Sequence, residues 1–531
     1  MNYSKHIIAA CLTVVFMASC TKLDLTPTND LTADKVYTSK EGYRSSLAKV
    51  YGAFALTGNA TTGNADIPSE IVKDEGNSDF LRLYWNLQEL TTDEAAWSWQ
   101  NDGGIQGLHE MSWSAINPIV NGLYYRSYFQ ITLCNEFIRQ SSDENLSTRG
   151  IAGADADDIK KYRNEARFLR AYQYWVLMDI YANVPFVTES DAIGSGLPKQ
   201  LERKDLFAYI ETELKAIEAD LAAPKTAEYG HADRGAAWAL LSRMYLNAKV
   251  YIGADRYTDA ITYANKIITA GYALHANYRE LTIADNHLNV GENIFTINYD
   301  GTNTQNWGGT TYLVHGPAKV PGSISGSSGD WGGLRCTQNF VNLFADYSGN
   351  TDKRAQFYTT GMSLNMNELY MSTDGFSTTK FRNLTRAGTK APNADPAGNW
   401  SDIDFPLFRL GEVYLTYAEA VLRGGTGGNP TTALSYIISL RTRAYGNANE
   451  NITQGALTLD FILDERGREL YYEASRRTDL IRFGKFTTNA YLWAWKGGVK
   501  AGTAVADKYN IFPLPSTDLS ANPNLKQNTG Y

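Results

Sequence analysis

The segment RNEARFLRAYQYWVLMDIY, residues 163–181, shows most clearly how this chain folds. Large apolar and aromatic side chains recur in it every three or four residues, so that Phe168, Tyr172 and Trp175 share one stripe of a helix. The pattern stops at Asn183, where an Asn-Val-Pro triplet begins, because proline disfavours a helical conformation in the residue before it. The segment therefore predicts a long helix with a buried aromatic face.

The same period returns in further segments of the chain. Residues 205–221 carry leucine and isoleucine three or four positions apart, which predicts a partner for the first helix. Two more predicted pairs are residues 234–251 with 257–268, and residues 410–422 with 431–444. Helix pairs of this length resemble divergent tetratricopeptide repeats. We expect an all-α dominated fold, a tetratricopeptide-like scaffold of helix pairs with loop-rich, largely irregular insertions.

The amino terminus has the pattern of a lipoprotein signal. A short charged start and an apolar run over residues 7–18 lead to the tetrapeptide MASC, in which small residues precede Cys20. We expect removal of residues 1–19 and lipidation of Cys20; the alternative is an ordinary signal peptide with a chance cysteine. The apolar run is shorter than the roughly 20 residues needed to cross a bilayer. Residues 20–531 should therefore form a single domain that acyl chains hold at a membrane.

Charge and cysteine content narrow the class of protein. The chain has 49 Lys and Arg against 57 Asp and Glu, a formal net charge of −8, and no basic run. Since nucleic-acid binding depends on neutralising phosphates, we expect no nucleic-acid partner. Beyond the signal and its lipidation site, only Cys134 and Cys336 remain. The sequence does not decide whether these two cysteines form a disulfide, but the apolar neighbours of Cys134 favour a buried free thiol.

Two stretches lack the helical period. Residues 57–104, here called the first insertion, and residues 298–402, the second insertion, are rich in Gly, Asn, Thr and Trp. The first contains one short apolar stretch over residues 80–90. About 100 residues are too many for a simple loop, so the second insertion should form a subdomain packed against the helices. Loops on a rigid frame commonly carry binding residues, and we expect the ligand site there.

The aromatic residues of both insertions stand beside polar groups. The chain has 34 Tyr and 11 Trp against 20 Phe, an excess of rings with a polar edge. Trp307 and Trp331 each precede two glycines, an unfavourable arrangement for a ring that only fills space. Such rings stack on the apolar faces of a sugar while Asp, Asn and Arg bind its hydroxyls. The candidate set is Asp74, Glu75, Arg82, Trp85, Trp97, Trp99, Asn101 and Asp102 in the first insertion, and Trp307, Tyr312 and Trp331 in the second.

Paired carboxylates raise the alternative of a glycoside hydrolase, which needs two carboxyls about 5 to 10 Å apart. One C-terminal helix carries Asp464, Glu465, Glu469 and Glu473. Arginines alternate with these carboxylates, which favours a salt-bridged helix face instead. Asp93 and Glu94 form a second pair, but adjacent side chains point apart. The sequence contains no zinc-protease motif, nucleophile elbow or phosphate loop, so we expect no catalysis.

A metal site has little support in the sequence. The residues Asp395, Asn399, Asp402 and Asp404 offer oxygen ligands for a structural calcium ion. They lack the spacing of a calcium loop and are more typical of a solvated turn. We expect no catalytic metal and no cofactor.

Segments spread over most of the chain resemble one known family. Beside the signal at Cys20, they are KVYTSKEGYRSSLAKVYGAF from Lys35, NEARFLRAYQYWVLMDIYANVPFV from Asn164, FPLFRLGEVYLTYAEAVLR from Phe405, LDERGRELYYEASRRTDLIRFGKF from Leu463 and NIFPLPSTDLSANPNLKQNTGY from Asn510. The chain resembles the SusD/RagB family of outer-membrane glycan-binding lipoproteins from Bacteroidetes. The resemblance implies a lipid-anchored surface binder, facing the cell exterior, that acts as a hinged lid on a SusC-like TonB-dependent transporter and delivers oligosaccharides for import.

Two further segments are similar to the starch-binding founding member of the family. They are KDEGNSDFLRLYWNLQELTTDEAAW from Lys73 and QNWGGTTYLV from Gln305, in which the founding member has a tyrosine at the Trp307 position. This resemblance implies an α-1,4-glucan ligand, starch or a malto-oligosaccharide. The ligand contacts that it implies are Asp74, Arg82, Trp99, Asn101, Trp307 and Trp331, with Trp97, Asp102 and Tyr312 as further candidates. The alternatives are the same scaffold with another glycan, such as a fructan or host glycan, and a helical glycoside hydrolase.

Overall fold

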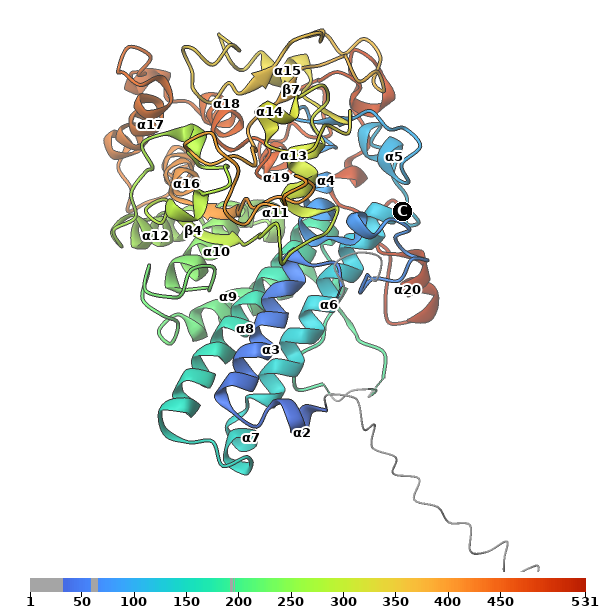
Figure 1. The fold of residues 1–531 in the computed structure, drawn as a ribbon, viewed down its shortest axis with the longest axis vertical. Coiled ribbons are helices and arrows are strands. Elements are labelled where there is room, and N and C mark those ends of the chain that lie inside the picture. Colours follow the sequence, from blue (N-terminus) through green and yellow to red (C-terminus); the bar gives the residue numbers. More distant parts are fainter. Residues whose placement is uncertain (1–31, 59–64, 192–193, 195) are drawn as a thin grey trace, which may run out of the picture.

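Long helices form the body of the protein (Figure 1). The computed structural model describes residues 32–58, 65–191, 194 and 196–531, so the signal segment and Cys20 lie outside the described residues. The longer helices are α3 (Lys40–Ala55), α4 (Phe80–Glu89), α6 (Pro118–Gln140), α8 (Gly153–Tyr181), α9 (Arg203–Ile217), α10 (Arg234–Leu246), α12 (Tyr257–Ile268), α16 (Leu410–Leu422), α17 (Pro430–Tyr445) and α18 (Leu459–Leu470). The helix-dominated prediction is confirmed.

The predicted helix pairs are present. Helix α8 packs against α9, α10 against α12, and α16 against α17. Neighbouring pairs are joined because α12 also packs on α16. Helices α3, α6 and α8 run side by side in the lower half of Figure 1, while much of the second insertion (yellow) lies across the top.

The structure differs from the periodicity in several places. Helix α8 begins at Gly153, ten residues before the predicted start. The apolar pattern did not show these first turns because they are polar and bury only Ala156 and Ile159. The segment predicted as residues 234–251 divides into α10 and α11 (Ala248–Ile252), between which Asn247 donates its amide to the Arg243 carbonyl. Helices α3 and α6 were not predicted from periodicity. The buried face of α6 includes polar side chains, which interrupt its apolar stripe.

Short elements make up the rest of the described fold. The remaining helices are α2 (Ala33–Val36), α5 (Ile105–His109), α7 (Asp143–Thr148), α13 (Gly309–His315), α14 (Gly322–Ser325), α15 (Gln338–Val341), α19 (Arg476–Arg482) and α20 (Ser516–Ala521). The strands are β1 (Ala96–Trp97), β2 (Val184–Pro185), β3 (Gln200–Leu201), β4 (Asn293–Ile297), β5 (Leu334–Arg335), β6 (Phe357–Tyr358), β7 (Ser377–Thr378) and β8 (Phe405–Arg409). They form antiparallel pairs, β1 with β5, β2 with β3, β4 with β8 and β6 with β7.

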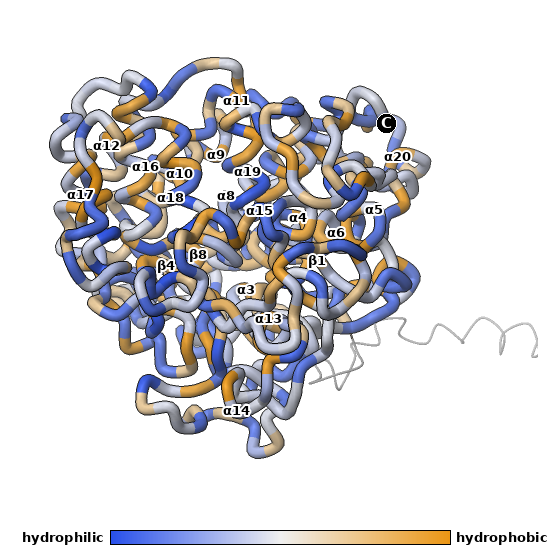
Figure 2. The backbone as a smooth tube through the Cα atoms, turned by 90° about the horizontal axis from the view of Figure 1, so that it is seen from above, coloured by the Kyte–Doolittle hydropathy of each residue, from blue (hydrophilic) through white to orange (hydrophobic). Residues whose placement is uncertain are grey.

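Strands close the base of the second insertion. Strand β4 ends where the insertion begins and β8 starts just after it ends, and the two pair with Ile297 opposite Phe405. Figure 2 shows β4 and β8 next to each other left of the centre, with α13 and α14 below them. The apolar stretch of the first insertion forms α4, whose residues are all buried. Both insertions are therefore anchored to the helical body.

Two smaller predictions can be compared with the structure. Cys134 and Cys336 are both buried and unpaired, so the free-thiol interpretation is confirmed. Burial raises the pKa of the Cys134 thiol to about 12. In the part of the chain that the structure describes, no helix is both long and apolar enough to cross a bilayer.

Candidate functional site

The two insertions meet through a short β-pair. Strand β1 of the first insertion pairs with β5 of the second, with Trp97 opposite Leu334. Beyond this pair, the Ser98 N–H donates to the Gly333 carbonyl at 3.0 Å and the Ser98 hydroxyl donates to the Gly332 carbonyl at 2.6 Å. The tryptophans of residues 97–99 are thereby placed beside those of the second insertion.

A continuous series of aromatic rings crosses this junction. Ring centroids lie 5.2 Å apart for Trp99 and Trp97, 5.3 Å for Trp97 and Tyr312, 6.5 Å for Tyr312 and Trp331, 6.0 Å for Trp331 and Trp307, and 4.2 Å for Trp307 and Trp400. We call these six rings the aromatic arc. Each ring contacts the next, so the predicted residues Trp97, Trp99, Trp307, Tyr312 and Trp331 form one continuous series with Trp400.

The rings of the arc differ in their access to solvent. Trp99 is 45% exposed and Trp307 36% exposed, and Trp331 and Trp400 are partly exposed. Trp97 and Tyr312 are only 1% exposed each, so a ligand cannot stack on them. Their candidacy as contact residues is corrected: they form the buried support on which the exposed rings pack.

Among the partly exposed tryptophans, the indole N–H separates the rings of the arc from Trp238 and Trp495; the buried Trp175 also leaves its N–H unpaired among the described residues. Trp85, Trp97, Trp113, Trp238 and Trp495 each donate the indole N–H to an oxygen of the protein. Within the described residues, the indole N–H groups of Trp99, Trp307, Trp331 and Trp400 have no such acceptor. A partly exposed ring with an unpaired N–H can stack on a ligand and donate to it.

Polar residues predicted for the site occupy different depths. Arg82 is buried, lies over the Tyr312 ring at 4.4 Å and donates from Nη1 to the Trp307 carbonyl at 2.9 Å. Its Nε has no partner among the described residues. Asp74 and Asn101 are exposed, and Asp74 Oδ1 accepts the Gly76 N–H at 2.8 Å. Asp102 Oδ2 accepts the Trp97 indole N–H at 2.8 Å. Arg82 thus holds the loop of Trp307, whereas Asp74 and Asn101 offer exposed polar groups.

The glycines that follow the tryptophans have a packing role. A Cβ on Gly308 would lie 2.2 Å from the Asp79 Cβ, and one on Gly333 would lie 2.1 Å from the Trp97 ring. Backbone that approaches another segment this closely requires glycine. Gly308 and Gly333 therefore allow the second insertion to pack on the first, a role that the sequence did not show.

Buried carboxyls sit under the Trp307 loop. The Asp79 Oδ1 accepts the backbone N–H groups of Arg82 and Gly309, each at 2.8 Å. Burial raises the pKa of Asp79 to about 6. Burial also raises the pKa of Glu75, which lies in the 3-10 turn η1 (Glu75–Ser78), to about 7. Desolvation disfavours the charged form of both acids.

Trp400 and His315 were not predicted from the sequence. The His315 ring stacks on Trp331 at a centroid distance of 5.0 Å, and its Nδ1 and Nε2 lie 2.7 Å and 3.0 Å from the carbonyl oxygens of Gly329 and Asn399. For Trp400 a signal existed, since it follows a Gly-Asn dipeptide in a polar loop much as Trp331 follows Gly-Asp. The place of His315 depends on tertiary contacts that the sequence does not display.

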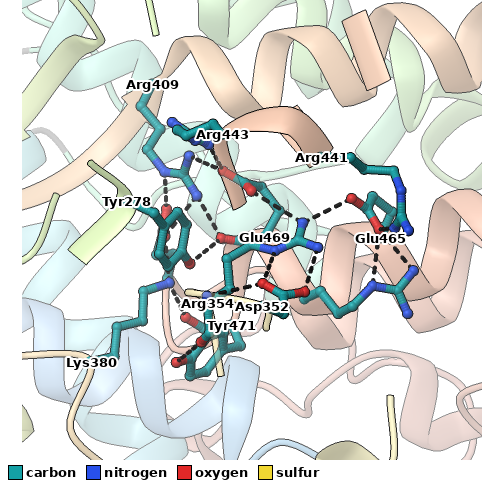
Figure 3. Close-up of polar contacts among 12 residues, drawn as sticks. Tyr278, Asp352, Arg354, Lys380, Arg409, Arg441, Arg443, Glu465, Glu469 and Tyr471 are labelled. Atoms are coloured by element: carbon teal, nitrogen blue, oxygen red, sulfur yellow. Dashed lines mark hydrogen bonds and ion pairs between the residues drawn. The ribbon is translucent and has the colours of Figure 1, made fainter. Parts of the chain in front are cut away.

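The candidate hydrolase carboxylates are buried in ion pairs (Figure 3). Glu465 binds Arg354 at 2.8 Å, and Glu469 binds Arg409 at 2.7 Å. Burial alone would raise the pKa of both glutamates, but the surrounding guanidinium groups hold it below the usual range. Arg468 pairs with Glu465 from the same helix, whereas Arg354 and Arg409 come from other segments of the chain. The prediction of a salt-bridged helix face is therefore only partly right: the glutamates are paired with arginines, but mostly with arginines of other segments, and the network is buried where a substrate cannot reach it.

The remaining acidic candidates also have protein partners. Asp93 binds Arg476 at 2.8 Å, and Glu94 accepts the Tyr472 N–H at 2.8 Å. The cluster proposed for calcium accepts hydrogen bonds instead: Asp395 from Asn399 N–H, Asp402 from Asn393 N–H, and Asp404 from the Tyr229 hydroxyl and the Tyr299 N–H. Among the described residues, no three His, Cys, Asp or Glu side chains are grouped closely enough to hold a metal ion.

A helical frame that presents partly exposed tryptophans with unpaired N–H groups is typical of one class of protein, the carbohydrate-binding proteins. Comparison with known proteins is more specific. The family model described as "SusD family" matches residues 291–531, and one described as "Starch-binding associating with outer membrane" matches residues 67–246. Starch-binding protein SusD of Bacteroides thetaiotaomicron is 34% identical, over 100% of this chain and 99% of the relative. The chain belongs to the SusD family.

Solved structures share the fold. A SusD superfamily protein from Parabacteroides distasonis aligns with a TM-score of 0.70 and 22% identity, covering 94% of this chain and 100% of that one. Surface glycan-binding protein A of Bacteroides thetaiotaomicron, solved in complex with laminarihexaose, aligns with a TM-score of 0.67 and 19% identity, covering 92% and 99%. Family membership identifies the chain as a glycan-binding protein and not an enzyme.

Proposed function

We propose that the protein captures α-1,4-glucans, that is starch and malto-oligosaccharides, on the aromatic arc. The observation that carries this proposal is the curvature of the arc. The exposed rings of Trp331 and Trp307 are inclined by 60° and those of Trp307 and Trp400 by 47°, so these rings cannot form one flat platform. An α-1,4-glucan curls and can follow such a surface, whereas a flat ribbon glycan needs coplanar rings.

The relative with 34% identity supports the same ligand, since it is named a starch-binding protein. The direct contacts in this proposal are the stacking rings Trp99, Trp307 and Trp331 and the exposed polar groups of Asp74 and Asn101. Arg82 acts from below through the Trp307 carbonyl. Trp97, Asp102 and Tyr312 hold the contacting groups in place.

A second candidate ligand is another curled glycan. One protein of the same fold was solved with laminarihexaose, so the scaffold carries other specificities. A fructan or a host glycan remains a candidate for the same reason. The ligand test must therefore compare glycans and not only measure binding to starch.

Titration calorimetry of the mature chain without its lipid provides this test. We expect heat with maltoheptaose and its cyclic counterpart, and none with a fructan or a xylan. Laminarihexaose is the matched competitor, of similar length but different linkage. Stronger binding of xylan or laminarihexaose than of maltoheptaose would overturn the α-glucan assignment.

We further propose that Cys20 carries the lipid, that the body faces the cell exterior, and that the protein closes over a SusC-like TonB-dependent transporter. The signal pattern at Cys20 and the family description "associating with outer membrane" support this placement. A Cys20→Ser variant should fail to incorporate a palmitate analogue and should leave the outer-membrane fraction. The transporter should co-purify with the wild type from solubilised membranes, and its absence would contradict the partnership.

A further inference from the structure

Trp400 lies at one end of the aromatic arc. Its ring centroid is 4.2 Å from that of Trp307, at an interplanar angle of 47°. Trp307 also contacts Trp331 at 6.0 Å, while no ring contact joins Trp331 and Trp400 in the described part of the chain. Trp307 therefore lies between the other two rings, and Trp400 extends the arc beyond it.

A packing role alone does not account for this ring. A tryptophan that only fills space would be enclosed, as Trp85, Trp97 and Trp175 are. Trp400 is instead partly exposed, and its indole N–H has no acceptor among the residues described. Its ring is thus available to a ligand beside its neighbour Trp307.

The backbone around Trp400 is held in place on both sides. The Asn383 amide donates to the Trp400 carbonyl at 3.0 Å, and the Ser401 N–H donates to the Thr311 hydroxyl at 3.1 Å. Thr311 belongs to α13, the helix that follows Trp307. His315 of the same helix lies 3.0 Å from the Asn399 carbonyl through Nε2. The ring is therefore positioned before a ligand arrives, which lowers the entropy lost on binding.

We propose that Trp400 forms an additional glycan subsite, so that the site binds long oligosaccharides more tightly than short ones. This inference rests on the proposed glucan-binding function and adds a length preference to it. A short oligosaccharide occupies the arc from Trp99 to Trp307, and a longer one also reaches Trp400. The added contact is a ring stack and a hydrogen bond from the indole.

The test is the ratio of the dissociation constants for maltotriose and maltoheptaose, measured by calorimetry on the mature chain. In Trp400→Ala we expect maltoheptaose to bind about tenfold more weakly and maltotriose to bind as in the wild type, so that the length preference shrinks about tenfold. Trp400→Phe should retain much of the preference because it keeps a ring. Trp238→Ala, which removes a partly exposed tryptophan of α10, is the matched control and should leave both constants unchanged. A melting curve verifies that each variant is folded.

The outcomes separate this inference from the proposed function. If the wild type binds no α-glucan, the proposed function is wrong and the length preference is wrong with it. If the wild type binds both sugars and Trp400→Ala changes neither, only the subsite is refuted. An equal loss for both sugars also refutes it, because Trp400 then supports Trp307 rather than contacting the far end of a longer chain.

Discussion

Replacing Trp307 by alanine should weaken glucan binding strongly while leaving the protein folded. The Trp307 ring contacts Trp331 and Trp400, so its removal interrupts the exposed part of the arc. Truncation of a central aromatic contact costs about 2 kcal/mol or more of binding free energy. This corresponds to an affinity for maltoheptaose that is about 30-fold weaker.

The cost to the fold is smaller than its total stability. The ring is 36% exposed and takes part in two ring pairs. Each aromatic pair contributes about 0.5 to 1.5 kcal/mol, which gives a loss of about 1 to 3 kcal/mol in the free energy of unfolding. Because native proteins are stable by about 5 to 15 kcal/mol, the variant should remain folded at room temperature.

Calorimetric titration with maltoheptaose, beside a thermal melt, separates the two effects. Trp307→Phe keeps a ring at the same backbone position and should recover most of the affinity. Trp238→Ala, which removes an indole that donates to Glu218, should change the melting temperature but not the affinity. Wild-type affinity in a folded Trp307→Ala variant would show that the arc does not contact the glucan, and the argument from its geometry would fail.

Three other perturbations probe the parts that hold the arc. Burial raises the pKa of Glu75 from 4.5 to about 7, so the folded protein binds this proton more readily than the unfolded chain, and the stability of the fold falls as the pH rises from about 4.5 to 7. Glu75→Gln should flatten this part of the profile of melting temperature against pH, and identical profiles for variant and wild type would contradict the assignment. Gly333→Ala places a Cβ 2.1 Å from the β1 indole and should cost about 1 to 3 kcal/mol of stability and weaken binding, unlike Gly455→Ala, whose Cβ has open space. Arg409→Ala leaves the buried carboxylate of Glu469 with one guanidinium partner fewer and should lower the free energy of unfolding by about 3 to 5 kcal/mol, as measured by urea titration. A loss below about 1 kcal/mol would refute the claim that a buried charge without its partner is this costly.

The helical scaffold was readable from the sequence where apolar residues kept a clean period. The pairs α8 with α9, α10 with α12 and α16 with α17 all appear because one face of each helix is apolar. Helix α6 was missed for the opposite reason. It buries Arg126, Gln130 and Asn135, whose polar groups are paired inside the protein and do not register as an apolar stripe. Residue type alone does not reveal that a polar side chain has a buried partner.

The site was readable in part. Residue types and the family resemblance predicted Trp99, Trp307 and Trp331 together, and in the structure all three are at least partly exposed and belong to one series of ring contacts. The sequence does not show the depth of each ring: Trp97 lies two residues from Trp99, yet Trp97 is buried and Trp99 is half-exposed, because Trp97 packs within the β1–β5 pair whereas Trp99 lies beyond the end of β1. Trp400 lies 93 residues from its ring partner, and only the fold brings the two together.

Buried charges fix the second insertion on the helical body. Lys380 of the insertion binds Glu473 at 2.6 Å, and Arg354, also of the insertion, binds Glu465 of α18 at 2.8 Å. Such pairs lose much of their attraction to desolvation and add little stability, yet a buried charge that loses its partner costs about 3 to 5 kcal/mol. Apolar packing is non-directional and permits small displacements, whereas these pairs allow one placement of the insertion. Because the arc takes its rings from both insertions, we infer that this charged anchoring serves ligand binding: rings that are already in register lose little freedom when the glycan binds.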